Sequence, residues 1–160
     1  MIIMAVCRLT LRFNNYIVTN KASPPMTVDK QGRYLATKIT MMPRDTNPHG
    51  TIFGGVILSH IDQSGAIGAR YSIRKEGFPD CALVTVAMNR VEFHHPVYVG
   101  DVVSFYSHVE RFGRTSITVH VTVEAERDGS ALMLTEADVT YVAVQLIDGE
   151  RRPVPIRGAE

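Results

Sequence analysis

The segment Arg44–Tyr71, RDTNPHGTIFGGVILSHIDQSGAIGARY, decides the fold. It reads as a polar loop that leads through a Gly-Gly pair into one long helical pattern, and the chain after it has the patterns of strands. Because a single helix among strands must be covered by them, the sequence predicts that this helix is a core element. Its internal carboxylate, Asp62, is the first candidate for chemistry.

Strand patterns lie on both sides of this segment. The expected strands are Tyr34–Thr40 before it and, after it, Cys81–Phe93, Val102–Phe112, Ser116–Arg127 and Ala131–Leu146. Strict alternation of apolar and polar residues in Ser116–Arg127 is typical of a strand with one buried and one wet face. Asp128-Gly129 predicts a tight hairpin, and the segment after Gly149 is expected to run along the surface. Such short turns demand antiparallel pairing, so we expect an α+β fold with one helix on one curved antiparallel sheet.

Length and composition place this chain among single-domain globular proteins. With 160 residues, the sequence predicts one domain over residues 26–160, preceded by an N-terminal extension over residues 1–25. A formal charge of +1 gives no sign of a nucleic-acid partner, and no stretch is long and apolar enough to predict a membrane span. Two lone cysteines, Cys7 and Cys81, form no disulfide framework, which favours a cytoplasmic location and argues against structural zinc.

The helical pattern has two different sides. At 100° per residue, one broad apolar side carries Phe53, Val56, Ile57, Ile61 and Ile67. The narrow opposite stripe carries Gly55, Ser59, Asp62 and Ala66. The sequence therefore aligns the Asp62 carboxylate with the Gly-Gly entrance of the helix.

Four glycines, at positions 54, 55, 65 and 68, lie in or beside this helix. A glycine inside a helix costs roughly 1 kcal/mol relative to alanine, so some close approach must offset that cost. A ligand can approach the helix start, or another element can approach the helix body. The free N–H groups of Gly54 and Gly55 at the positive end of the helix dipole are suited to bind an oxyanion.

The spacing of these groups adds a constraint. From Gly55 to Asp62 a helix rises roughly 10 Å, so one small reacting group cannot touch both in the same chain. We therefore expect a site shared by two chains, in which the helix start of one subunit faces Asp62 of the other.

Each of these residues also has a purely structural interpretation. Asp62 can be held by a neighbouring hydroxyl such as that of Ser59 and only adjust packing, and the glycines can serve packing alone. Asn47 in DTNPHG is by default a turn residue. His60 fits a hydrogen-bonded core position better than a catalytic one. No HxxxH or His/Cys spacing predicts a metal site, and no Gly-x-Ser-x-Gly elbow predicts a serine hydrolase.

Four motifs in order carry a family resemblance over residues 34–146. They are PRDTNPHGTIFGGVILSHIDQSGA, VTVAMNRVEFHHPVYVGDVV, GRTSI and a strand that ends in TYVAV. This set resembles the hotdog-fold acyl-CoA thioesterases, most closely the bacterial YciA-like acyl-CoA hydrolases. The resemblance implies a hotdog fold, in which a curved antiparallel sheet wraps around one long helix and two sheets join in a dimer. It also implies hydrolysis of acyl-CoA thioesters to free acid and CoA.

The resemblance assigns roles residue by residue. The family's helix acid falls on Asp62, as general base on water or as nucleophile. Its helix-start glycines fall on Gly54 and Gly55, whose amides would polarise the thioester carbonyl, and its loop asparagine on Asn47, a further side chain at the thioester. Its contact with CoA phosphates falls on the turn residues Arg114, Thr115 and Ser116.

The remaining expectations concern partners and alternatives. The resemblance implies no cofactor beyond the CoA of the substrate, and a homodimer that assembles further into a tetramer or hexamer. His94-His95, and Phe53 in place of the histidine of an HGG motif, depart from relatives and leave the preferred acyl chain open. Two other functions fit the same fold: a non-catalytic acyl-CoA sensor, and an enoyl-thioester hydratase or dehydratase with a His and acid pair.

Overall fold

The structure is a computed structural model that describes residues 28–158. The predicted N-terminal extension, residues 1–25, lies outside the described residues. The elements follow in the order β1 (Tyr34–Thr40), η1 (Pro43–Asp45), α1 (Gly54–Lys75), β2 (Ala82–Phe93), β3 (Val102–Phe112), β4 (Ser116–Arg127), β5 (Ser130–Ile147) and β6 (Glu150–Pro153). No helix within residues 28–158 is long and apolar enough to cross a membrane.

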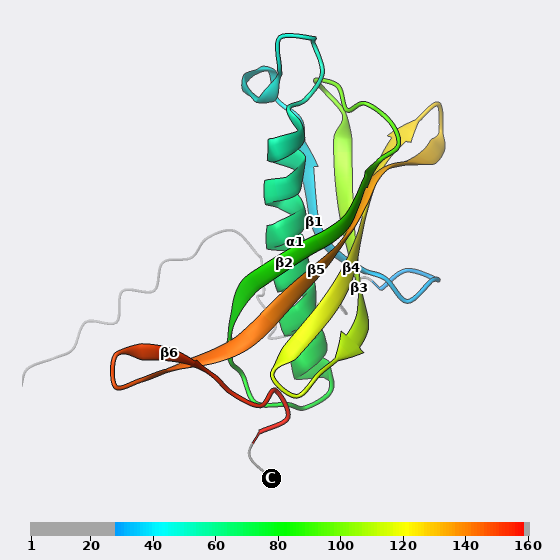
Figure 1. Cartoon of the computed structure of the whole chain (residues 1–160). Helices are drawn as coiled ribbons and strands as arrows, with labels where there is room; N and C mark the ends of the chain where they lie inside the picture. Colours follow the sequence, from blue (N-terminus) through cyan, green and yellow to red (C-terminus); the bar gives the residue numbers. More distant parts are fainter. Residues whose placement is uncertain (1–27, 159–160) are drawn as a thin grey trace, which may run out of the picture.

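All the strands belong to one antiparallel sheet. Its order is β1-β3-β4-β5-β2, and β6 forms a hairpin with the end of β5. Figure 1 shows the sheet curving along α1, which packs mainly on β3 and β4. The sheet is open, because β1 and β2 lie at its two edges. The predicted arrangement of one helix on one curved antiparallel sheet is therefore confirmed.

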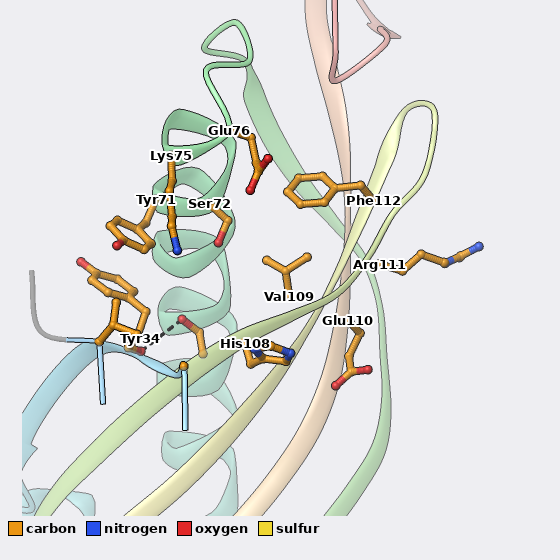
Figure 2. Close-up of a pocket in the computed structure, with 13 residues that line it drawn as sticks. Tyr34, Tyr71, Ser72, Lys75, Glu76, His108, Val109, Glu110, Arg111 and Phe112 are labelled. Atoms are coloured by element: carbon orange, nitrogen blue, oxygen red, sulfur yellow. Dashed lines mark hydrogen bonds between the residues drawn. The ribbon is translucent and has the colours of Figure 1, made fainter. Parts of the chain in front are cut away.

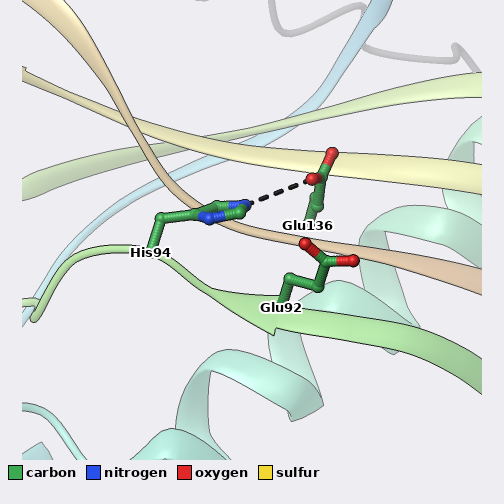
Figure 3. A group of neighbouring side chains, drawn as sticks. All are labelled: Glu92, His94 and Glu136. Carbon is green, nitrogen blue, oxygen red and sulfur yellow. Dashed lines mark hydrogen bonds and ion pairs between the residues drawn. The ribbon is translucent and has the colours of Figure 1, made fainter.

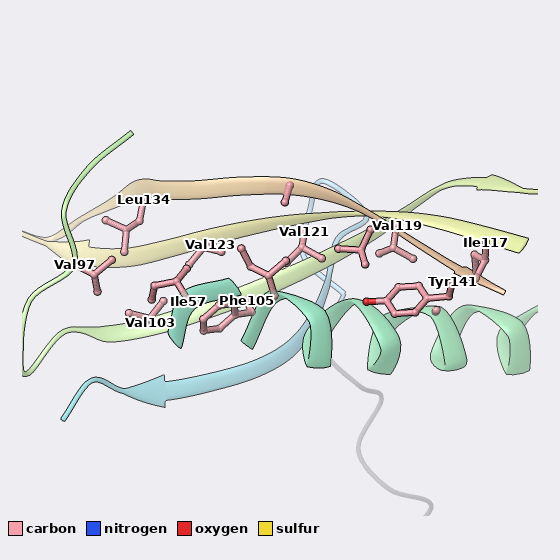
Figure 4. Close-up of a cluster of buried hydrophobic side chains, with 14 of the residues drawn as sticks. Ile57, Val97, Val103, Phe105, Ile117, Val119, Val121, Val123, Leu134 and Tyr141 are labelled. Carbon is pink, nitrogen blue, oxygen red and sulfur yellow. The ribbon is translucent and has the colours of Figure 1, made fainter. Parts of the chain in front are cut away.

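The hydrophobic core lies between α1 and the central strands. The inward row of β4 is Ile117, Val119, Val121, Val123 and Ala125, and all five are buried. Figure 4 shows residues 117–123 of this row facing the helix, and Ile57 and Ile61 of α1 belong to the same buried cluster. The alternation in the sequence of this strand predicted its buried face correctly.

Two of the helix glycines let the sheet approach the helix closely. A Cβ atom at Gly65 would overlap the hydroxyl of Tyr141, and one at Gly68 would overlap the side chain of Ser107. Both glycines are buried. At these two positions the close approach of another element accounts for glycine in the helix interior.

The predicted apolar side of the helix is partly wrong. Phe53 is 59% exposed and Ile67 is 39% exposed, although both were expected on the apolar side that faces the sheet. The buried stripe is Ile57, Ile61, Ser64, Gly65, Gly68, Ala69 and Ile73. Small residues share this face with three isoleucines and let the sheet come close to the helix. Phe53 and Ile67 lie outside this stripe, on the surface of the single chain.

Much of the segment after Gly149 is exposed as expected, but Ile156 is buried in the core, and the segment also forms a strand that the sequence did not predict. Asp148 and Gly149 both have positive φ, 52° and 81°, which folds β5 back onto β6. All four residues of β6 are exposed. Because neither face of β6 is buried, its sequence lacks the alternation of apolar and polar residues that predicts a strand.

Candidate active site

Asp62 lies in the middle of α1 and is tied to the neighbouring strand. Its Oδ1 accepts a hydrogen bond of 2.6 Å from the hydroxyl of Thr85 on β2. Its backbone carbonyl accepts a second bond, of 2.7 Å, from the hydroxyl of Tyr141 on β5. The carboxylate is therefore held by a hydroxyl from the sheet, and not by Ser59 of its own helix. Thr85 is a site residue that the sequence did not predict.

Tyr141 fixes the backbone behind this carboxylate. Its side chain is 1% exposed, and the space for its hydroxyl exists because residue 65 is glycine. Burial, together with the nearby charge of Asp62, raises the pKa of the Tyr141 phenol well above its ordinary value. Tyr141 consequently stays a neutral hydrogen-bond donor at physiological pH.

The start of α1 presents free amide groups. Phe53 caps the helix with extended backbone and makes no side-chain capping bond. Within residues 28–158, no acceptor is paired with the N–H of Gly54 or Gly55. Free amides at the positive end of a helix dipole favour an oxygen that carries negative charge. This part of the chain therefore has the donors that an oxyanion site needs.

A pocket of about 360 Å³ opens beside this helix start. Thr51, Ile52, Gly54 and Ile57 line one side, and residues 93–97 line the other. The ring of Phe93 comes within ordinary contact distance of a Cβ placed on Gly54, at 3.5 Å. The pocket is thus formed between the helix start and the end of β2.

Asn47 organises the loop that leads to the pocket. Its Oδ1 accepts hydrogen bonds from the backbone N–H of His49 (2.9 Å) and of Thr51 (3.3 Å). Its Nδ2 donates to the hydroxyl of Thr51 at 2.8 Å. The turn role that the sequence favoured for Asn47 is confirmed, and one Nδ2 hydrogen remains for a ligand because the amide nitrogen carries two.

Arg114, Thr115 and Ser116 lie far from the helix start. Arg114 and Thr115 lie in the turn between β3 and β4, and Ser116 begins β4; Figure 1 places this turn near the other end of α1. Backbone bonds fix the turn, since the carbonyls of Arg114 and Thr115 accept from Ile156 and Ala143 at 2.9 and 2.8 Å. Arg114 is exposed beside a pocket of about 410 Å³ that it shares with Arg157.

One chain does not bring the predicted site residues together. Asp62 follows Gly55 by seven residues in a continuous helix, a rise of roughly 10 Å. The Asp62 side chain instead faces β2, whose outer edge pairs with no described strand. Along this edge Val86 is 56% exposed and Phe93 is 54% exposed. In the single chain, Asp62 therefore lies beside an open strand edge that exposes two large apolar side chains among polar ones.

A further pocket, of about 280 Å³, lies at the end of α1 between the helix and β3 (Figure 2). Tyr34 and Tyr71 stack in its wall, with ring centres 4.2 Å apart. None of the predicted catalytic or CoA-binding residues lines it. His60 lines neither this pocket nor the pocket at the helix start. Its half-buried ring packs against the ring of Phe105, with 5.5 Å between the ring centres. This is close to the core position predicted for it.

The sequence of this chain matches the family model described as "Thioesterase superfamily" over residues 49–132. The acyl-CoA thioester hydrolase YciA of Salmonella typhimurium is 38% identical over 129 residues, which cover 78% of this chain and 92% of the relative.

Two solved structures agree with this match. A hexameric hotdog-fold thioesterase of Campylobacter jejuni is 44% identical with a TM-score of 0.65, and the match covers 79% of this chain and 92% of that one. An acyl-CoA hydrolase of Staphylococcus aureus, in complex with butyryl coenzyme A, coenzyme A and coenzyme A disulfide, is 27% identical with a TM-score of 0.64. That match covers 76% of this chain and 70% of the other. The fold and family predicted from the sequence are confirmed: this chain belongs to the thioesterase superfamily, as a hotdog-fold relative of the YciA acyl-CoA thioester hydrolases.

Proposed function

We propose that this chain hydrolyses acyl-CoA thioesters to free carboxylic acids and CoA. The observation that carries the proposal is the Asp62 carboxylate, which Thr85 holds beside an open edge strand in a chain of this family. A carboxylate can act as a general base on water or as a nucleophile. The named activity of the Salmonella typhimurium relative supports the same reaction.

In the general-base route, Asp62 takes a proton from a water molecule whose oxygen attacks the thioester carbonyl carbon. The carbonyl electrons move to the oxygen, which becomes an oxyanion. The oxyanion collapses and the C–S bond breaks, so that the thiolate of CoA leaves and takes up the proton. In the nucleophilic route, Asp62 attacks the carbonyl carbon itself, CoA leaves, and water then hydrolyses the acyl-aspartyl anhydride. Both routes consume one water and release one acid and one thiol.

The helix start would stabilise the oxyanion of either route. The amides of Gly54 and Gly55 are fixed donors without an acceptor in residues 28–158, so they need no rearrangement when charge develops. The remaining Nδ2 hydrogen of Asn47 would orient the same thioester, because Asn47 and the pocket share Thr51. Because these groups lie roughly 10 Å from Asp62 of their own chain, the proposal places them opposite Asp62 of a partner.

The assembly we propose is a homodimer as the catalytic unit and a hexamer in solution. A second copy would cover four exposed apolar side chains: Phe53 just before α1, Ile67 on α1, and Val86 and Phe93 on β2. The Campylobacter jejuni relative is a hexamer, which supports the larger assembly.

The CoA part of the substrate would be held at the turn between β3 and β4. Arg114 is exposed there, and a guanidinium is suited to phosphate, while Thr115 and Ser116 supply hydroxyls. CoA is itself part of the substrate, so the proposed reaction needs no added cofactor. We also propose a cytoplasmic location, where acyl-CoA is present and where Cys81, a free thiol, would stay reduced.

The direct test is thiol release from purified protein with acyl-CoAs of increasing chain length. We expect turnover, and we expect Asp62→Asn to lose nearly all of it while the circular dichroism spectrum and the oligomer size stay unchanged. Asp80→Asn is the matched control, because Asp80 is an exposed carboxylate whose ion-pair partners among residues 28–158 are the surface arginines Arg70 and Arg74. Full activity in Asp62→Asn would refute the site, and tight acyl-CoA binding without turnover in the wild type would refute the reaction.

A further inference from the structure

Three side chains with metal-binding chemistry converge on the face of the sheet that points away from α1. They are Glu92 near the end of β2, His94 just after that strand, and Glu136 of β5 (Figure 3). A single ligand atom from each lies within 4.8 Å of the other two. Glu92 and Glu136 are direct partners across the two strands, and His94 is two residues further along the chain on the same face.

The spacing of these atoms is close to what a bound cation needs. Zinc binds histidine nitrogen and carboxylate oxygen at about 2.0–2.2 Å, so two ligands at a tetrahedral angle lie about 3.3 Å apart. His94 Nε2 and Glu136 Oε1 are already 3.1 Å apart. Only Glu92, whose side chain is exposed and makes no ion pair or side-chain hydrogen bond with the described residues, has to turn inward.

A second histidine, His120, orients the Glu136 carboxylate through its other oxygen, Oε2. His120 Nε2 lies 3.3 Å from Glu136 Oε2, and His120 Nδ1 lies 2.8 Å from Asp138 Oδ1. The chain of contacts from Asp138 through His120 to Glu136 leaves Oε1 directed at His94. Hydrogen-bonded partners of this kind fix the ligands of natural metal sites and raise their affinity.

The charges of the cluster also favour a cation. Like charges placed directly opposite each other on neighbouring strands are destabilising, and Glu92 opposes Glu136. A divalent ion between the two carboxylates would convert this repulsion into attraction. One imidazole with two carboxylates is a ligand set for zinc and similar transition metals, whereas magnesium prefers oxygen ligands alone in an octahedron.

We propose that Glu92, His94 and Glu136 form a binding site for a divalent transition-metal ion of the zinc class, with water completing the coordination. The site adjoins the candidate active site, because His94 also lines the pocket at the helix start. Phe93, between two of the ligands, faces Gly54 at the helix start. The bound ion joins the end of β2 to β5 and braces the segment that lines the pocket at the helix start. The proposal does not depend on the thioesterase reaction.

The test is a calorimetric titration of Zn²⁺ alone into the full-length, metal-stripped protein. We expect one ion per chain, and a loss of affinity of tenfold or more in each of His94→Ala and Glu136→Gln. We expect His120→Ala to weaken binding by about ten- to a hundredfold, since it removes the group that orients Glu136. An excess of Mg²⁺ should not displace the Zn²⁺.

The matched control is His95→Ala, which removes the neighbouring histidine and leaves the cluster intact. It should bind Zn²⁺ with wild-type affinity. Thermal unfolding of each variant without metal separates loss of the site from loss of the fold, and Glu136→Gln keeps the shape of the side chain. Absence of Zn²⁺ binding to the wild type would overturn the proposal, as would equal affinity of the wild type, His94→Ala and Glu136→Gln.

Discussion

The Thr85 hydroxyl donates a 2.6 Å hydrogen bond to Oδ1 of Asp62 and so ties the middle of α1 to the edge strand β2. Hydrogen bonds to a charged group contribute about 1.5–3 kcal/mol, which is enough to set the direction of a catalytic carboxylate. Thr85→Val keeps the shape of the side chain and removes the donor. We expect kcat to fall about tenfold, since about 1.4 kcal/mol corresponds to a factor of ten.

The control for this change is Thr118→Val, because Thr118 makes its hydrogen bond with Thr140 on the far side of the sheet. Steady-state kinetics with one acyl-CoA compares the two variants. If both lower kcat equally, the bond to Asp62 has no special role.

Arg114 is predicted to act on binding and not on the chemical step. We expect Arg114→Ala to raise KM for acyl-CoA about tenfold and to leave kcat nearly unchanged, because a charge-assisted phosphate contact is lost in ground state and transition state alike. An acyl thioester of N-acetylcysteamine has no phosphate, so its kcat/KM should not change. An equal loss with both substrates would place Arg114 outside the phosphate contact.

Gly68 is predicted to be required for packing. A Cβ at this position would overlap the Oγ and Cβ atoms of Ser107. Overpacking costs about 1–3 kcal/mol and the better helix propensity of alanine returns about 1, so we expect Gly68→Ala to lose about 2 kcal/mol in free energy of unfolding at most. Chemical denaturation measures it. Gly55→Ala is the control, since its Cβ would meet only the exposed ring of Phe53, and equal stability of the two variants would contradict this account.

Tyr141 should make stability fall at high pH. Its folded-state pKa is raised by burial and by Asp62, while the unfolded phenol ionises near pH ~10. The stabilising contribution is therefore fully present below pH ~10 and is lost as the pH rises toward the folded-state pKa. Tyr141→Phe should cost about 1 kcal/mol at neutral pH and show a shallower fall above pH ~10. Urea unfolding at pH values below and above pH ~10 measures the free energy of unfolding of both proteins. If this free energy falls as steeply with pH in Tyr141→Phe as in the wild type, Tyr141 is not the group responsible.

Much of the fold follows from the sequence because alternation and turns are local signals. The bounds of Tyr34–Thr40, Val102–Phe112 and Ser116–Arg127 were predicted as the structure has them. The buried side of α1 was predicted only in part. Ile57 and Ile61 are buried as expected, but hydrophobic periodicity does not distinguish a side chain that meets the sheet from one left for another surface. Phe53 and Ile67 are of the second kind, and the buried face also carries glycine and serine.

The candidate site could also be predicted only in part from the sequence. Asp62 and the helix-start glycines could be named from the sequence because they lie within one helix. Thr85 could not, since its partner is 23 residues away and depends on how β2 lies against the helix. The cluster of Glu92, His94 and Glu136 was likewise hidden, because its ligands come from two strands and a register shift in β2 between Asn89 and Glu92 sets which residues face each other.

The central claim is that each active site combines the helix start of one subunit with Asp62 of another. Two variants separate the halves. Asp62→Asn removes the carboxylate, and Gly54→Pro removes a helix-start amide at a position where proline fits, because Gly54 is the first helical residue and Phe53 before it is extended. Each variant alone should be folded and inactive.

The decisive measurement is the acyl-CoA hydrolysis rate of assemblies formed by unfolding and refolding the two variants together in equal amounts. Shared sites predict recovery of about a quarter of wild-type activity, because half of random dimers are mixed and each mixed dimer contains one intact site. Sites formed within one chain predict no recovery, and that result would contradict the account.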